Sequence, residues 1–150
     1  MKTIFDPATR DALTTRVNAL NENSKALWGK MNVYEMTRHC AIWNEWVLGK
    51  NDIPNKQGLL GRIFGKMALK SNTKDDKPLG KNMPAGSAFT IKQKEGDLAT
   101  QKKILVDLIA DFENFSDEQF MHDFFGKMTR EQIGIFAYKH SDHHLRQFNV

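Results

Sequence analysis

Residues 129–147, TREQIGIFAYKHSDHHLRQ, carry the clearest indication of how this chain folds. They open with Thr129 and, three residues later, Gln132, a capping-box pair that is typical of the first turn of a helix. Apolar residues then recur at the spacing of one helix face, namely Ile133, Phe136 and Ala137. The stretch predicts a long helix that buries one face and runs almost to the C-terminus.

Three further segments share these features. Asp6-Pro7 begins the first, because an N-cap acceptor is followed there by proline at the first helical position. Asn32 and Glu35 form a capping box for the second, which we expect over residues 33–48, and the third begins at Gly96-Asp97. Alternating strand-like runs are nearly absent. Four such helices predict an all-α fold, a four-helix bundle.

The starts of two helices also share a short pattern. Residues 28–32, WGKMN, precede the second helix, and residues 125–129, FGKMT, precede the last one. Each reads as an aromatic residue, then Gly-Lys-Met, then a cap residue. The repeated entry favours two helical hairpins arranged pseudo-symmetrically.

Composition limits the class of protein. The 150 residues hold 22 Lys and Arg against 18 Asp and Glu, a formal charge of +4, and one cysteine. A single cysteine excludes an intramolecular disulfide framework and a cysteine-rich zinc site. No window approaches eighteen apolar residues, and the N-terminus lacks a signal-peptide pattern. We therefore expect one cytoplasmic domain, residues 1–150, with no membrane partner.

A long connection of different composition separates the second and third predicted helices. We expect a short helix near residues 58–70 and then a crossover through the turn-forming run 70–87. Residues 56–81 have a net charge of +5, so the rest of the chain sums to −1. The charged residues are Lys56, Arg62, Lys66, Lys70, Lys74, Lys77 and Lys81 against Asp75 and Asp76. Aromatic residues scarcely interleave with them, which favours a solvated basic loop over a segment that binds anions or nucleic acid.

Histidines replace apolar residues on two predicted helices. His140 and His144 lie one turn apart where the apolar stripe of the last helix would continue, and His39 lies between Met36 and Trp43 on the apolar side of the second. Buried imidazoles need partners, and a shared cation would satisfy all three. The pattern predicts a three-histidine site for one divalent transition metal such as zinc, nickel or iron, with coordination positions open for water or substrate.

The alternative is a set of ordinary hydrogen-bonded core histidines, because pairs at this spacing are common on helices. His143, at the edge of the same face, is the main competitor for a ligand role and otherwise a neighbour of the ligands. His122 is expected to seal one end of the bundle. Because His144 lies six residues from Val150, near an end that frays, we expect a bound metal to protect that end from proteolysis.

Polar neighbours are candidates for orienting the ligands. Glu35 lies one turn before His39 and can orient or ligate, but its capping box is an equally good explanation. Gln147 lies one turn beyond His143 and is placed to hold a bound water. Cys40 points away from the direction of His39 and is interpreted as a small buried filler. The tryptophans are expected in the core: Trp28, Trp43 and Trp46.

These motifs together resemble the DinB-like superfamily of helical-bundle proteins, many of them described as metal-dependent enzymes. The resemblance rests on Trp28, His39 and the closing His-x-x-His-His-x-x-Gln pattern of His140, His143, His144 and Gln147. It implies an up-down-down-up four-helix bundle with a long crossover between helices two and three. It also implies one divalent ion held by His39, His140 and His144.

Three functions are compatible with the sequence. The first is a metal-dependent enzyme of unknown substrate, transferase or hydrolase; some DinB-like proteins use a low-molecular-weight thiol, which makes such a thiol a candidate substrate. Many members read His-His-Arg-Gly-Gln, whereas Leu145 and Arg146 stand here between His144 and Gln147. The second is a non-catalytic metal-binding or stress-related binding module, and the third is an anion or nucleic-acid binder through residues 56–81. The sequence names no catalytic residue, and its helix faces permit a homodimer.

Overall fold

The computed structural model describes residues 1–83, 86–116 and 120–150. Its elements in chain order are α1 (Pro7–Ala19), α2 (Val33–Val47), α3 (Leu59–Thr73), the short η1 (Ser87–Phe89), α4 (Leu98–Asp111), the short η2 (Phe112–Asn114), β1 (Met121–His122), β2 (Gly126–Lys127) and α5 (Arg130–Gln147). The all-α prediction is confirmed at the level of class, because the described chain is mainly helical. The two-residue strands β1 and β2, which pair antiparallel, were not predicted.

The predicted caps explain where the helices begin. Asn32 accepts a hydrogen bond from the backbone N–H of Glu35, and the Glu35 carboxylate accepts one from the backbone N–H of Asn32. Thr129 and Gln132 make the same reciprocal pair at α5. Asp6 accepts from Thr9 at the start of α1. These bonds satisfy backbone donors that have no partner inside a helix, and they fix the helix starts from sequence-local residues.

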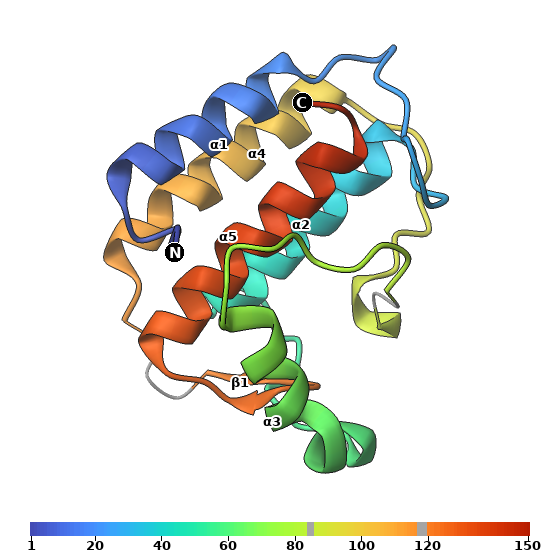
Figure 1. The fold of residues 1–150 in the computed structure, drawn as a ribbon. Coiled ribbons are helices and arrows are strands. Elements are labelled where there is room, and N and C mark those ends of the chain that lie inside the picture. Colours follow the sequence, from blue (N-terminus) through green and yellow to red (C-terminus); the bar gives the residue numbers. More distant parts are fainter. Residues whose placement is uncertain (84–85, 117–119) are drawn as a thin grey trace.

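Four helices pack around the hydrophobic core. Helix α2 lies against α4 and α5, and α1 lies against the same two helices (Figure 1). Leu13, Met36, Trp46, Ile109 and Leu145 are among the residues that fill the space between them, each at most 2% exposed. None of the helices in the described ranges is both long and apolar enough to span a bilayer.

Helix α3 stands at one end of this packed group (Figure 1). It is longer than the predicted helix near residues 58–70, since it continues to Thr73. Gly61 and Gly65 face the backbone of Phe124; a Cβ on either would come within 2.4 Å and 2.1 Å, respectively, of the Phe124 carbonyl oxygen. The glycine face of α3 is therefore seated on the turn between β1 and β2.

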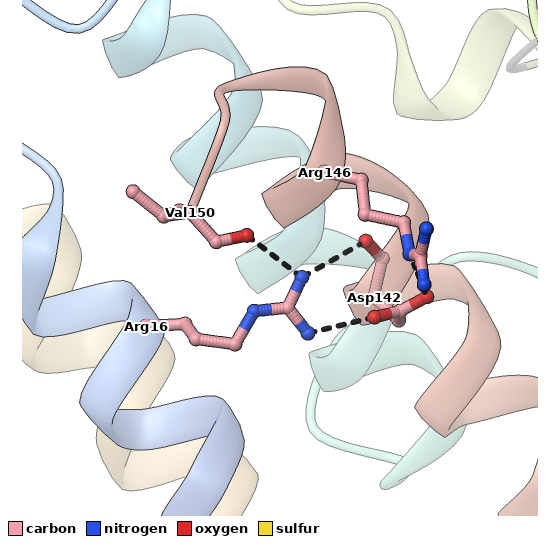
Figure 2. Close-up of polar contacts among 4 residues, drawn as sticks. All are labelled: Arg16, Asp142, Arg146 and Val150. Atoms are coloured by element: carbon pink, nitrogen blue, oxygen red, sulfur yellow. Dashed lines mark hydrogen bonds and ion pairs between the residues drawn. The ribbon is translucent and has the colours of Figure 1, made fainter.

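The C-terminus is tied to α1. Arg16 donates through Nη1 to Asp142 Oδ1 at 2.7 Å and through Nη2 to the Val150 carbonyl oxygen at 2.9 Å, and Arg146 Nε donates to Asp142 Oδ2 at 2.8 Å (Figure 2). Arg16 thus links α1 to both α5 and the last residue of the chain. The end where fraying was expected is held by contacts that require no metal.

Candidate metal centre

Three histidines from two neighbouring helices meet in the interior. His39 comes from the middle of α2, and His140 and His144 come from successive turns of α5. His39 Nε2 lies 3.2 Å from His140 Nε2, and one ring nitrogen from each of the three residues lies within 4.8 Å of the others. A cation with nitrogen bonds of about 2.0–2.1 Å in tetrahedral geometry holds its ligand atoms about 3.3 Å apart. The three histidines could therefore bind a metal ion.

Hydrogen bonds at Nδ1 of His39 and His144 determine which ring nitrogen of each residue keeps a free lone pair. His39 Nδ1 lies 2.9 Å from the Phe89 carbonyl oxygen, and His144 Nδ1 lies 3.0 Å from Gln147 Oε1. Both partners are acceptors, because Gln147 uses its Nε2 to donate to the Trp28 carbonyl oxygen at 2.6 Å. Each Nδ1 consequently carries the proton, and each Nε2 offers its lone pair. This is the arrangement found around metal-binding histidines.

His140 differs from the other two. Its ring stacks on Trp43, with centroids 4.3 Å apart, and within the described structure its buried Nδ1 has no hydrogen-bond partner. In the neutral cluster alone, His140 Nε2 must donate to His39 Nε2, since the latter is an acceptor. An ion between the rings would replace that bond by two lone-pair contacts. A shared cation therefore accommodates the facing Nε2 atoms of His39 and His140, while His140 Nδ1 keeps no partner in the described structure.

The surroundings keep all three rings neutral. Burial lowers the pKa of His39, and burial together with the neighbouring His144 and His39 lowers the pKa of His140 well below its usual value. For His144, burial first and then the neighbouring His39 lower the pKa to about 3. His39 and His144 are only 2% and 8% exposed, while His140 keeps partial exposure. Neutral imidazole is the form that binds transition metals.

Sequence comparison places the chain in a family. The profile of a family described as "Protein of unknown function (DUF1569)" matches residues 5–150. The chain belongs to the DUF1569 family. Searches of curated proteins and of solved structures each returned no match. Because the family description assigns no activity, the functional argument for this DUF1569 protein rests on the histidine cluster itself.

The predicted neighbours of the cluster take different places. The Glu35 carboxylate accepts a hydrogen bond in the capping box of α2, which is the alternative role predicted for it. The Phe89 carbonyl, rather than Glu35, is the partner of His39 Nδ1. Gln147 contacts His144 Nδ1 directly, which gives it an orienting role for the ring. His143 is not part of the three-histidine group, and its ring meets the Trp28 ring edge-on, with centroids 5.7 Å apart.

Other predicted residues of the DUF1569 chain lie in the core. Cys40 is buried with its sulfur 3.8 Å from that of Met36, and burial raises the pKa of its thiol. His122 is packed among aromatic rings at the α3 end, with Trp46 and Phe125 centroids at 5.2 Å and 4.4 Å. Both placements agree with the structural roles predicted for them.

Sequence reasoning missed the two backbone carbonyls that complete the site, those of Phe89 and Trp28. The WGKMN pattern, which recurs as FGKMT, was the available sequence signal for the Trp28 carbonyl. Gly29 has φ +81°, and a Cβ there would lie 2.5 Å from Gln147 Nε2, so the glycine after Trp28 lets Gln147 reach the Trp28 carbonyl. Lys81 of the crossover covers the Trp28 ring, with Nζ 4.4 Å from its centroid.

Proposed function

We propose that this DUF1569 protein binds one divalent transition metal through Nε2 of His39, His140 and His144. The observation that carries the proposal is a pair of hydrogen bonds, which His39 Nδ1 donates to the Phe89 carbonyl and His144 Nδ1 donates to Gln147 Oε1. They leave the Nε2 lone pairs of His39 and His144 free beside His140. Nitrogen ligands suit zinc, nickel or iron(II), and the three donors do not select among them.

The proposed activity is that of a metal-dependent enzyme of unknown substrate. When bound, the ion would supply a Lewis acid with a coordination position left open by three protein ligands. The protein contributes orientation and a dry environment: Phe89 and Gln147 fix two rings, and Trp43 supports the third. A low-molecular-weight thiol is the candidate substrate that the DinB-like resemblance suggests, and transferase and hydrolase chemistry both remain open.

We also propose that the packed helices α1, α2, α4 and α5 form a DinB-like four-helix bundle of up-down-down-up order. The support is twofold: α1 and α2 each pack against α4 and α5, and the long connection between α2 and α4 is where such a bundle has its crossover. The closing His-x-x-His-His-x-x-Gln pattern on α5 supplies further support.

One observation favours a second candidate, a non-catalytic metal-binding module. His39 and His144 are almost fully shielded from solvent, which restricts the approach of a substrate. Cobalt substitution separates the two candidates, because the absorption of Co²⁺ responds to its ligands. A spectrum that changes on addition of a small thiol supports an exchangeable position and the enzyme; a spectrum that does not change supports the inert module.

Metal content tests the site directly. Untagged protein purified without chelator is expected to hold about one transition-metal ion per chain. His144→Ala should lose the ion, while His143→Ala, a matched change of the adjacent histidine, should retain it. Metal-free wild-type protein that also fails to take up zinc by calorimetry, or equal zinc affinity in both variants, would overturn the proposal.

A further inference from the structure

The outward face of α3 exposes a continuous apolar surface. Leu59, Leu60, Ile63 and Met67 are each between 64% and 74% exposed, and Phe64 is 48% exposed. We call these five residues the α3 face. Side chains of this size present on the order of 600 Å² of apolar surface, which is at the upper end for the largest patch on a typical monomer. Such a face marks a surface that binds something.

The seating of α3 fixes this face outward. Gly61 and Gly65 lie on the opposite side of the helix, against the Phe124 backbone, where any larger residue would collide. Gln57 adds a bond from Nε2 to the Phe124 carbonyl, and Lys139 caps the far end by donating to the Asn72 and Asp75 carbonyls. Turning α3 to hide its apolar residues would break this seat, so the α3 face stays exposed in the isolated chain.

A row of positive charge runs beside the α3 face. Arg62, Lys66, Lys70 and Lys74 recur every fourth residue, so they follow one edge of the helix, and all four are exposed. With Lys56 they give residues 56–74 a charge of +5, and no acidic residue occurs in that range. The rest of the chain, by contrast, sums to −1.

We propose that α3 binds an anionic lipid surface, lying in the plane of the interface with its apolar face among the acyl chains. Leu, Ile, Phe and Met on one face with Lys and Arg beside them is the composition of interfacial helices, which need no membrane-spanning length. The expectation of no membrane partner rested only on the lack of a segment that could span a bilayer, and this proposal revises it. The inference is independent of the metal site.

Charge decides between lipid and a second copy of this chain. Two copies joined through the α3 face would bring together two rows of cations with no acidic residue in either helix to pair with them. Lysine is also depleted at the centres of protein interfaces. An anionic lipid surface instead supplies the counter-charge, with a gain of about fivefold in binding for each lysine or arginine near it.

Vesicle flotation of the full chain tests the proposal. We expect binding to vesicles of mixed phosphatidylglycerol and phosphatidylcholine at about 50 mM salt, weaker binding at about 500 mM, and little binding to phosphatidylcholine alone. Leu60→Gln should weaken binding about tenfold or more, whereas Leu27→Gln, the same change at an equally exposed leucine elsewhere, should not. Lys66→Gln with Lys70→Gln should weaken it about thirtyfold relative to Lys92→Gln with Lys94→Gln.

Three results would overturn the proposal. The first is absence of binding to the anionic vesicles at low salt. The second is binding that the lysine changes weaken but Leu60→Gln does not, which would indicate a general anion or nucleic-acid site without insertion. The third is a stable dimer in sedimentation equilibrium that Leu60→Gln converts to monomer, which would assign the α3 face to a second copy. Circular dichroism checks that the variants keep their fold.

Discussion

The histidine cluster and the α3 face break the usual inside-outside pattern in opposite directions. Between α2 and α5, imidazoles occupy interior positions where aliphatic side chains are expected, and on α3, large apolar side chains occupy exposed positions where polar ones are expected. Buried polar groups and exposed apolar patches are the informative exceptions in a folded protein. We propose a different partner for each region: a cation for the histidine cluster and an anionic lipid surface for the α3 face.

Replacement of His140, whose Nδ1 has no partner in the described structure, should have the largest effect on metal binding and little effect on the stability of the metal-free protein. His140→Leu is expected to abolish stoichiometric zinc binding and to leave the metal-free protein about as stable as wild type, because the removal of a buried nitrogen that has no partner offsets the loss of the bond to His39 Nε2. Denaturant unfolding of metal-free protein, with zinc titration alongside, measures both. Loss of stability in the metal-free state would show that His140 is an ordinary core residue.

Acid should destabilise the metal-free interior before it affects the carboxylates. The folded-state pKa values of all three histidines lie below their unfolded value of about 6.5, so the unfolded chain binds more protons and stability falls as pH falls below that value. With the folded pKa of His144 at about 3, this residue alone contributes a loss of about 2 kcal/mol between pH 6.5 and pH 4.5. Urea midpoints across this range measure it. A flat profile would place the histidines in a solvated setting.

A single added methyl group should loosen the packing of α3 against the turn that contains Phe124. Gly65→Ala places a Cβ against the Phe124 carbonyl and is expected to cost about 2–3 kcal/mol, seen as faster hydrogen exchange or proteolysis within α3. Gly80→Ala is the matched control, since a Cβ there meets nothing within 4 Å. Equal behaviour of the two variants would mean that α3 is not held by its glycine face.

The hydrogen bond between Gln147 and His144 should set the zinc affinity of the histidine cluster, and its loss should weaken zinc binding without abolishing it. Gln147→Leu removes the acceptor at His144 Nδ1 and is expected to lower zinc affinity ten- to hundredfold, which corresponds to about 1.4–2.7 kcal/mol. Competition with a chromophoric chelator measures the change. Glu35→Gln is a useful comparison, because Glu35 caps α2 and touches no ligand nitrogen in the described structure. Similar affinities in both variants would remove the orienting role of Gln147.

Local rules predicted much of this fold, because caps join residues three apart. The pairs Asn32 with Glu35 and Thr129 with Gln132 fixed two helix starts, and the helical stripe put His140 and His144 on the inner face. The meeting of His39 with that pair was expected from its position on the apolar side of its own helix.

The remaining features depend on contacts that leave no local signal. Every residue has a carbonyl, so the sequence could not single out Phe89 as the partner of His39. On α3, both the glycines and the apolar residues recur at helical spacing, and only the contact with Phe124 decides which set is buried. The repeated Gly-Lys-Met entry carried more structure than its length suggested, since Gly29 and Gly126 both adopt positive φ, at 81° and 76°.

The smallest expected effect concerns the end of α5, beside the inner region. Arg16→Gln breaks the partly exposed bonds to Asp142 and Val150 and is expected to cost about 1 kcal/mol, with faster cleavage of the last residues by a carboxypeptidase (Figure 2). Arg62→Gln, on exposed α3, is the matched control. In wild type the Arg16 bonds already hold the C-terminal residues in place without zinc. Zinc bound through His144 should therefore slow cleavage more in Arg16→Gln than in wild type. If zinc slows cleavage equally in both, the tail is held through His144 alone and the α1 contact adds nothing to its order.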